Sequence, residues 1–236
     1  MLLKISTIAL IPSLIIQGNA VKKNILRLPE PEGKRFGTVG TGKTLSLLIV
    51  GDSAAAGVGV EIQDDALLGA VLNQLQAGYE ISYQLEATTG HTSGQVIKTV
   101  KNMPAQHFDV VITSVGVNDI TKLTSPKDWI QKQQQLYAAI NQKFMPELII
   151  AAGVPPMNLF PALPNPLAWL FGQYAKGMNK NLAKFVQQQA NMQWIEYDLE
   201  RFKTLNLEMA ADGFHPSKEI YALWAEQVAD KVRQMF

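Results

Sequence analysis

The feature that most constrains the fold is a repeated alternation of short apolar runs with longer amphipathic runs. Residues 45–50, apolar apart from Ser46, and residues 109–115 are apolar on both faces, which is typical of strands buried on both sides of a parallel sheet. Residues 61–77 instead carry one apolar stripe at helical spacing. This alternation predicts an α/β domain whose parallel sheet is covered by helices on both faces.

Five strands and five main helices follow from the same pattern. The predicted strands are 45–50, 81–85, 109–115, 148–152 and 194–197, and the predicted helices are 61–77, 93–103, 126–144, 166–189 and 217–235. There is no internal repeat and no linker between two cores. We therefore expect one domain over residues 45–236, preceded by an N-terminal region over residues 1–44.

The first sixteen residues are mostly apolar and leave three interpretations open. They could form a helix resting on the domain or on a membrane surface, a signal peptide cleaved after Gly18–Ala20, or a short anchor. Lys22, Lys23 and Arg27 follow the apolar run and oppose export of what comes next. A full span needs about 20 residues. We favour the resting helix with peripheral membrane contact through residues 1–16, and a cytoplasmic or membrane-associated protein. A signal peptide would instead make the protein periplasmic or secreted.

Charge and cysteine content exclude several classes of protein. The chain has 21 Lys and Arg against 20 Asp and Glu, a net charge of +1, which argues against a nucleic-acid partner. It has no cysteine, so disulfides and thiolate metal sites are ruled out.

Residues 37–44 match the phosphate-loop pattern G-x-x-x-x-G-K-[ST] letter for letter. That pattern works when a strand precedes the loop and a helix follows it, so that the helix N-terminus holds the phosphate. Here a polar, proline-bearing segment (29–35) precedes the match and the strand at 45–50 follows it. We interpret the match as a flexible lead-in turn.

Three consecutive predicted strands end in residues suited to catalysis. Ser53 follows the first strand within Gly51-Asp52-Ser53, Gly90 follows the second, and Asn118 follows the third. Each has an ordinary explanation as a helix cap or turn former. Together they place a hydroxyl, a bare backbone N–H and a side-chain amide at the carboxyl edge of the sheet, where sites of such folds form.

A histidine and an aspartate stand together just before the last helix. Asp212 and His215 are three residues apart in one tight turn, which lets the carboxylate orient the imidazole as a general base requires. His107 precedes a strand and is expected to be solvated. His91 lacks a nearby carboxylate and is expected to form a wall of the pocket.

These segments resemble the four signature blocks of the SGNH (GDSL-type) hydrolase family. Gly51-Asp52-Ser53, Gly90, Gly116-Val117-Asn118-Asp119 and Asp212-x-x-His215 occur in the family's order, and the resemblance spans about residues 45–236. It implies a flavodoxin-like, three-layer α/β/α sandwich with a five-stranded parallel sheet. One departure is Thr88, which stands where many members have Asn.

The resemblance also implies roles for single residues. Ser53 is the implied nucleophile, His215 its base and Asp212 the orienting carboxylate. The implied oxyanion hole consists of the Ser53 and Gly90 backbone N–H groups and the Asn118 amide. Such chemistry needs no metal or organic cofactor, because preorganised dipoles stabilise the developing charge.

The expected activity is therefore that of a serine esterase acting through an acyl-enzyme, on short to medium acyl chains, lysophospholipids or thioesters. The loop at 153–166 follows the fourth strand, so it should border the cleft as an acyl wall, unless it is plain core packing. The predicted substrate contacts are Asp52, His91, Met157, Phe160 and Leu163. A carbohydrate O-deacetylase is the main alternative, and a non-catalytic acyl-binding module is another.

Overall fold

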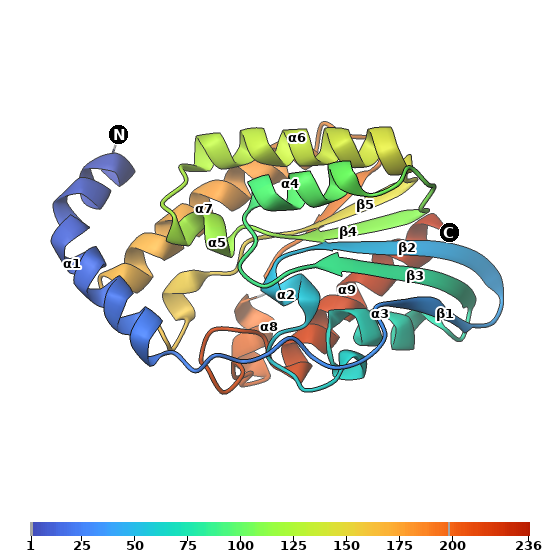
Figure 1. Cartoon of the computed structure of the whole chain (residues 1–236), viewed down its shortest axis with the longest axis horizontal. Coiled ribbons are helices and arrows are strands. Elements are labelled where there is room, and N and C mark those ends of the chain that lie inside the picture. The colour runs from blue at the N-terminus through green and yellow to red at the C-terminus, as the bar shows by residue number, and fades with distance from the viewer. Residues whose placement is uncertain (1, 198) are drawn as a thin grey trace.

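The computed structural model describes residues 2–197 and 199–236 and is built around a six-stranded sheet (Figure 1). The strand order is β1-β3-β2-β4-β5-β6, in which only the edge strand β1 runs antiparallel to its neighbour. The strands are β1 (Phe36–Gly40), β2 (Lys43–Gly51), β3 (Tyr79–Ala87), β4 (Val110–Ser114), β5 (Leu148–Ala152) and β6 (Met192–Ile195). The five predicted parallel strands are β2 to β6.

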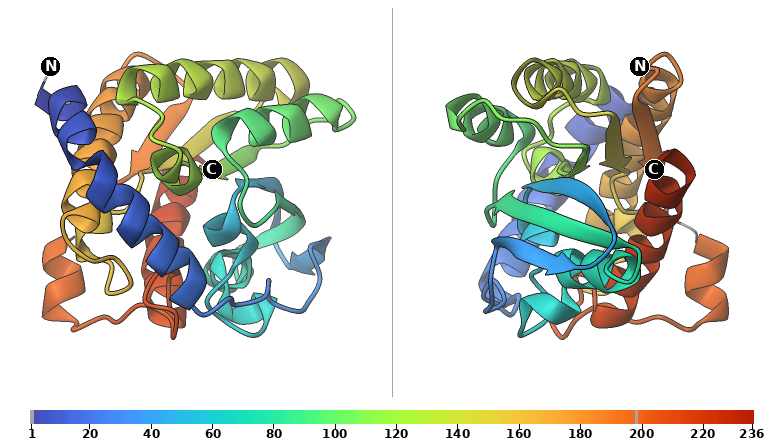
Figure 2. Two further views of the ribbon diagram at one scale, coloured as in Figure 1. Left: turned by 60° about the vertical axis from the view of Figure 1, so that its left-hand side comes forward. Right: turned by 90° about the vertical axis from the view of Figure 1, so that its right-hand side faces the viewer.

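Helices cover both faces of the sheet, which makes three layers. The helices are α1 (Leu2–Asn24), α2 (Ser53–Ala56), α3 (Leu67–Leu75), α4 (Ser93–Asn102), α5 (Val117–Thr121), α6 (Pro126–Phe144), α7 (Leu167–Val186), α8 (Leu199–Thr204) and α9 (Lys218–Met235). Side chains of α4, α6 and α7 pack on one face, and those of α3 and α9 pack on the other. The right-hand view of Figure 2 separates α4 and α6 from α9 across the sheet.

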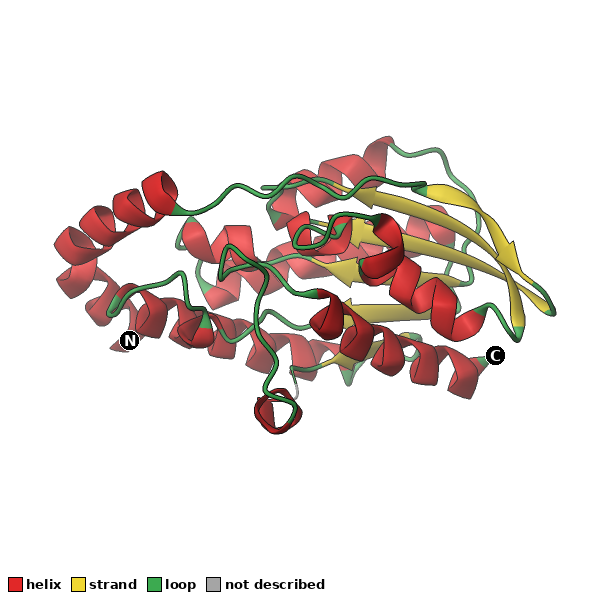
Figure 3. Ribbon diagram, turned by 90° about the horizontal axis from the view of Figure 1, so that it is seen from below, coloured by secondary structure: helices red, strands yellow, loops and turns green. Residues whose placement is uncertain are grey.

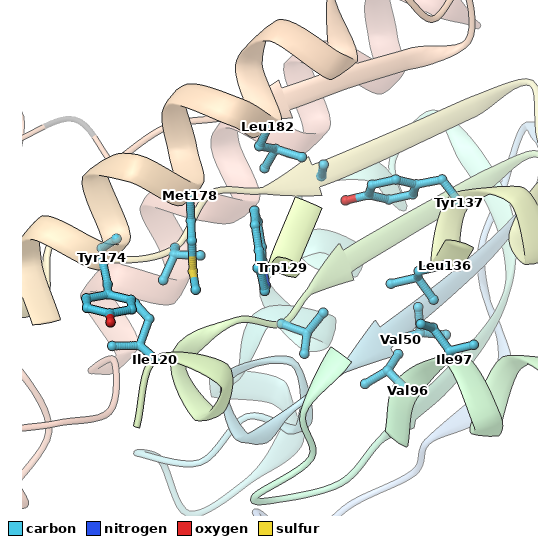
Figure 4. Packing of buried hydrophobic residues seen from close by; sticks show 14 of the residues in the cluster. Val50, Val96, Ile97, Ile120, Trp129, Leu136, Tyr137, Tyr174, Met178 and Leu182 are labelled. Carbon is cyan, nitrogen blue, oxygen red and sulfur yellow. The ribbon is translucent and has the colours of Figure 1, made fainter. Parts of the chain in front are cut away.

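The core explains why the strands are apolar on both faces. In β2, Leu48 and Val50 point into the layer of α4, α6 and α7, while Leu47 and Ile49 point into the layer of α3 and α9. Figure 4 shows the first layer, with Trp129 of α6 packed among side chains of α7. Burying one such side chain contributes roughly 1.5–3 kcal/mol, so this packing fixes the strand ends that carry the site.

The expected turn over residues 37–44 is corrected by the structure. Its first part is strand β1, which pairs with β3, and Lys43 and Thr44 are the first residues of strand β2 rather than of a helix. Gly40 has a φ of +86°, and a Cβ there would lie 2.2 Å from the Tyr79 carbonyl oxygen. Gly40 is therefore needed because the backbone passes too close to Tyr79 to leave room for a side chain. Through β1 the lead-in belongs to the same sheet as residues 45–236, and the sheet gains a sixth strand.

Helix α1 is longer than the apolar run that predicts it. It packs on α7, where the Thr7 Oγ1 lies 3.1 Å from the Tyr174 hydroxyl and the Gln17 side chain bonds to the backbone of Asn165 and Leu167. Residues 5–24 form one helix long and apolar enough to cross a membrane, judged by length and composition, a test that signal sequences also pass.

Candidate active site

Ser53 lies at the carboxyl end of β2, as the first residue of the short helix α2. The Asp52 side chain caps this helix by accepting a hydrogen bond from the Ala54 N–H at 3.1 Å. The first N–H groups of a helix have no acceptor within it, so the Ser53 N–H is free of intrahelical bonding. The side chains that follow, Ala54 to Ala56, are small, and Ser53 itself is buried but lines a cavity at the sheet edge.

His215 and Asp212 reach Ser53 from the loop before α9. The Nε2 atom of His215 lies 2.9 Å from the Ser53 Oγ, and its Nδ1 atom lies 2.5 Å from the Asp212 Oδ2. The other carboxylate oxygen of Asp212 accepts the N–H groups of Phe214 and His215, each at 2.9 Å. Burial would raise the pKa of Asp212, but these hydrogen bonds outweigh it and hold that pKa below its ordinary value. The carboxylate therefore stays charged and fixes the imidazole.

An aromatic contact holds this loop against the body of the protein. The ring of Phe214 lies edge-to-face on Phe160, with centroids 5.1 Å apart, and also on the His215 imidazole at 5.3 Å. The Ala162 N–H donates to the Gly213 carbonyl at 3.2 Å. Edge-to-face pairs contribute about 0.5–1.5 kcal/mol beyond area burial. Phe214 thus holds the His215 ring in place from the middle of the Asp212-x-x-His215 block, a contact that the block's spacing alone did not reveal.

The side chain of the predicted oxyanion donor Asn118 is hydrogen-bonded to the residue that follows the other predicted donor, Gly90. The Asn118 Nδ2 donates to the carbonyl oxygen of His91 at 3.0 Å. A primary amide has two N–H groups, so the second can serve a substrate oxygen. Gly90 adopts a φ of +83°, which favours glycine, in a turn closed by the His91 N–H on Thr88. His91, expected as a pocket wall and substrate contact, is not among the residues that line the cavity beside Ser53; its contact with Asn118 is through its backbone carbonyl.

A buried hydrogen-bond network supports this side of the site. Asp119, which follows Asn118, is fully buried and accepts both the N–H and the hydroxyl of Ser93 at 2.8 Å. Lys132 lies 3.2 Å from its other oxygen, and Gln133 donates to the Ser93 hydroxyl. Helix α5 is thereby tied to α4 and α6, which fixes the position of Asn118.

The lead-in segment also reaches this side. The Thr89 N–H and hydroxyl both donate to one Glu30 oxygen at 2.7 Å, and Arg35 pairs with the other at 2.6 Å. The turn that presents Gly90 is therefore held from outside the predicted domain.

Asp52, expected to contact substrate, is held by the backbone. Its second oxygen accepts the Gly116 N–H at 3.4 Å, and its own N–H donates to the Ser114 carbonyl at 3.0 Å. Burial raises the pKa of Asp52 to about 7, against the lowering effect of the Ala54 and Gly116 N–H groups. Asp52 lines the cavity described next, but its hydrogen bonds join the ends of β2 and β4.

An apolar cavity of about 620 Å³ opens beside the Ser53–His215 pair. Its apolar wall comes from the loop after β5, from α8 and the residues after it, and from the start of α9. These apolar residues include Val154, Pro155, Leu159, Phe160, Phe202, Leu207, Met209, Phe214 and Ile220. The described lining residues include neither Lys nor Arg, and Asn206 and Glu208 add polar groups. The cavity therefore suits an uncharged, largely apolar group next to the nucleophile.

The structure separates the three residues expected to form the acyl wall. Phe160 lines the cavity, whereas Met157 and Leu163 are buried in the core and do not belong to the lining. The correction has a local cause. Residues 157–159 form a single 3₁₀ turn, in which successive side chains point in different directions, so that Leu159 lines the cavity while Met157 is fully buried in the core.

Sequence reasoning missed the segment at 199–209, which supplies Phe202, Leu207 and Met209 to the cavity. A usable signal was present. The segment lies between the end of the last strand and the Asp212-x-x-His215 block, so it had to cross the same edge of the sheet. Figure 3 shows that the strands point toward one end of the molecule and that loops lie beyond their tips.

Comparisons with known proteins agree with this geometry. Residues 49–223 match the model of the GDSL-like lipase/acylhydrolase family. A member of the lipolytic G-D-S-L family from Veillonella parvula has a TM-score of 0.63 at 13% identity and covers 78% of this chain and 96% of its own. The acetylxylan esterase Axe2 from Geobacillus stearothermophilus scores 0.56 at 15% identity, with coverage of 81% and 95%. The M. smegmatis aryl esterase scores 0.59 at 18% identity, with coverage of 81% and 100%. None of the curated proteins matches.

In this three-layer α/β fold, Ser53 is hydrogen-bonded to a histidine–aspartate pair at the carboxyl edge of the sheet, which is the arrangement of residues found in serine hydrolases. Within that class, this chain belongs to the GDSL-like lipase/acylhydrolase family, because the family model covers most of its length.

Proposed function

We propose that this protein is a serine carboxylesterase that hydrolyses neutral esters of short to medium acyl chain length. One observation carries the proposal. An unbroken line of contacts runs from the Ser53 hydroxyl through both nitrogens of His215 to Asp212, at the wall of an apolar cavity. A non-catalytic acyl-binding module would have no use for this line.

The first half of the reaction forms an acyl-enzyme. The His215 Nε2 accepts the Ser53 proton while the Ser53 Oγ attacks the ester carbonyl carbon. The Ser53 N–H, the Gly90 N–H and the Asn118 amide stabilise the negative charge on the carbonyl oxygen. As the tetrahedral intermediate collapses, the C–O bond to the alcohol breaks, and His215 gives its proton to the leaving oxygen.

The second half frees the enzyme. His215, held by Asp212, takes a proton from water, and the resulting hydroxide attacks the acyl-enzyme carbonyl. The same donors hold the second oxyanion. Ser53 then leaves with the proton returned by His215, and the carboxylic acid is released.

The cavity supports a neutral acyl chain as its occupant. Its charged residues are acidic or belong to the catalytic loop, so a substrate phosphate gains no cationic partner there. A lysophospholipid would have to keep its headgroup outside the cavity. A thioester presents the same acyl group and remains compatible.

A carbohydrate O-deacetylase is the second candidate. Asn206 and Glu208 lie at the cavity and could bond to sugar hydroxyls. Axe2, similar in fold, is an acetylxylan esterase. Against this candidate, an acetyl group fills little of an apolar cavity of about 620 Å³.

A series of p-nitrophenyl esters of increasing acyl length tests the proposal. Each buried methylene contributes up to about 0.8 kcal/mol, so kcat/KM should rise from acetate toward butyrate or hexanoate and fall for long chains. Phe160→Ala enlarges the cavity and should move the optimum to longer chains.

Leu163→Ala is the matched control, because Leu163 is buried nearby but does not line the cavity. It should lower stability and leave the optimum unchanged. A strict acetate preference that persists in Phe160→Ala would reject the apolar acyl site and favour the deacetylase.

A further inference from the structure

Helix α1 is apolar on two opposite sides, and the protein covers only one of them. Leu14 is buried in the core on the inner side, with Leu3, Leu10 and Val21 packed against it. The outer side exposes large apolar side chains to between 43% and 71%. They are Ile5, Ile8, Ile11, Ile15 and Ile16. A helix that is apolar all round belongs in a core or a membrane, so the outer side lacks its expected apolar partner.

The exposed isoleucines form one continuous face. Successive helical residues turn by about 100°, which places these five isoleucines within an arc of about 140°. Lys22 and Lys23 fall within the same arc near the end of the helix, and both are exposed. The outer face is therefore an apolar stripe that ends in positive charge.

Charge is distributed unevenly along the chain in a way that suits an anionic surface. Residues 1–29 contain four basic residues, Lys4, Lys22, Lys23 and Arg27, and no Asp or Glu. The rest of the chain holds the other 17 of the 21 basic residues and all 20 acidic ones. An apolar helix face flanked by Lys and Arg is the pattern of helices that lie in the lipid interface and favour anionic lipids.

The position of α1 adds to this argument. It lies at the end of the molecule toward which the strands point (Figure 1 and Figure 3). Its last turn and the residues after it line a second cavity of about 440 Å³ together with Asp212 and Ala211. A surface bound to α1 would thus lie at the same end of the molecule as the catalytic loop.

We propose that α1 docks this protein on an anionic lipid surface. The isoleucine face inserts at the boundary of the acyl chains, and Lys22 and Lys23 meet the headgroups. Thr7 and Gln17 keep the inner face on α7, so the helix lies in the interface rather than crossing it. This proposal is independent of the esterase assignment, because it concerns binding only.

Flotation of the purified full-length protein with lipid vesicles tests it. Vesicles are made of phosphatidylcholine alone or with phosphatidylglycerol. We expect binding to the anionic vesicles and at least a tenfold loss of partitioning in Ile8→Ser/Ile15→Ser/Ile16→Ser. The matched control is Phe36→Ser/Met145→Ser, which removes exposed apolar side chains outside α1 and should bind as the wild type does.

The charge is tested separately. Lys22→Gln/Lys23→Gln should lose on the order of fivefold per lysine on anionic vesicles and nothing on neutral ones. Lys98→Gln/Lys127→Gln, exposed lysines of α4 and α6, is the control. Circular dichroism melts confirm that each variant is folded.

Five outcomes would overturn the proposal. The wild type could fail to bind, or the isoleucine variant could bind equally well. Light scattering could show that the wild type is a dimer and the isoleucine variant a monomer, which would make the isoleucine face an interface with a second copy of the chain. Binding that persists in high salt and in alkaline carbonate, and that is equally strong in Lys22→Gln/Lys23→Gln, would indicate a helix that spans the membrane. A mature chain from cells that begins after Ala20 would exclude docking by α1 altogether.

Discussion

Within the residues that the structure describes, two histidine–aspartate pairs lie at opposite edges of the same sheet. At the carboxyl edge, His215 and Asp212 lie 2.5 Å apart and their side chains are 16% and 1% exposed. At the other edge, His107 and Asp109 lie 3.0 Å apart and are 49% and 23% exposed. Each pair also has a serine beside it, Ser53 at the first and Ser46 at the second.

The difference lies in how the serine is connected. The Ser53 hydroxyl meets the imidazole, which can accept its proton. The Ser46 hydroxyl instead donates to the Asp109 carboxylate at 2.7 Å, and its oxygen accepts the Asp109 N–H at 2.8 Å. Burial would raise the pKa of Asp109, but hydrogen bonds from Ser46 and His107 lower it below its ordinary value, so it is a weak base. The same three residue types thus form the proposed catalytic triad at one edge and a hydrogen-bonded strand anchor at the other.

Replacing the two histidines separates the pairs most strongly. His215→Asn removes the imidazole that contacts the Ser53 hydroxyl, which we propose as its base, and should lower kcat by about 10⁶, as for loss of a nucleophile's base in other serine hydrolases. His107→Asn should leave kcat and KM unchanged. Steady-state kinetics on one p-nitrophenyl ester compares them, and equal losses would make the contrast between the two edges wrong.

The two aspartates should differ nearly as much. Asp212→Asn keeps the shape but removes the charge that orients the imidazole, and should lower kcat by about 10⁴. Asp109→Asn should keep full activity and lose about 1–3 kcal/mol of unfolding free energy, since it weakens bonds to Ser46. Denaturant titration and kinetics together check the pair. A large drop in kcat for Asp109→Asn would show that the two edges are coupled.

The strand pattern, the Asp212–His215 turn and the order of Ser53, Gly90 and Asn118 were predictable because each depends on local sequence. Strand β1 was not, because a short exposed strand is defined by its distant partner β3. The direction of the Met157 side chain could not be predicted either, because a proline-rich loop has no regular hydrophobic pattern that shows which side chains point inward. The Phe202 wall of the cavity depends on how a long loop folds back over the sheet edge.

Replacing Asn118 should lower kcat less than replacing His215 or Asp212. It contributes one donor of three, so Asn118→Ala should lower kcat by roughly 10²–10³ with KM little changed. Asn118→Asp, which cannot donate when ionised, should fall at least as far. If the loss appears in KM alone, Asn118 binds the ground state instead of the oxyanion.

Asp52 should show the opposite sign of pH dependence from Asp212 and Asp109. Its folded pKa of about 7 lies above the ordinary value of 3.8, so the folded state holds its proton more tightly. Stability from this group is present at acid pH and declines as pH rises from about 4 to 7, by on the order of a few kcal/mol. Asp212 and Asp109, with lowered pKa values, lose stability as pH falls.

Urea unfolding of the wild type and Asp52→Asn across this pH range checks the sign. The wild type should lose stability relative to the variant as pH rises. A difference that is flat with pH, or that favours the wild type at neutral pH, would show that Asp52 is charged in the folded state.

Covalent labelling of Ser53 tests the central assignment most directly. The protein is treated with a p-nitrophenyl phosphonate, which phosphonylates an activated serine. The labelled peptide is then identified by mass spectrometry. We predict a single adduct, on Ser53. It should form at the wild-type rate in His107→Asn and far more slowly in His215→Asn. In folded Ser53→Ala both the adduct and the esterase activity should be absent. An adduct on another serine, or turnover retained by folded Ser53→Ala, would contradict the assignment of Ser53 as the nucleophile.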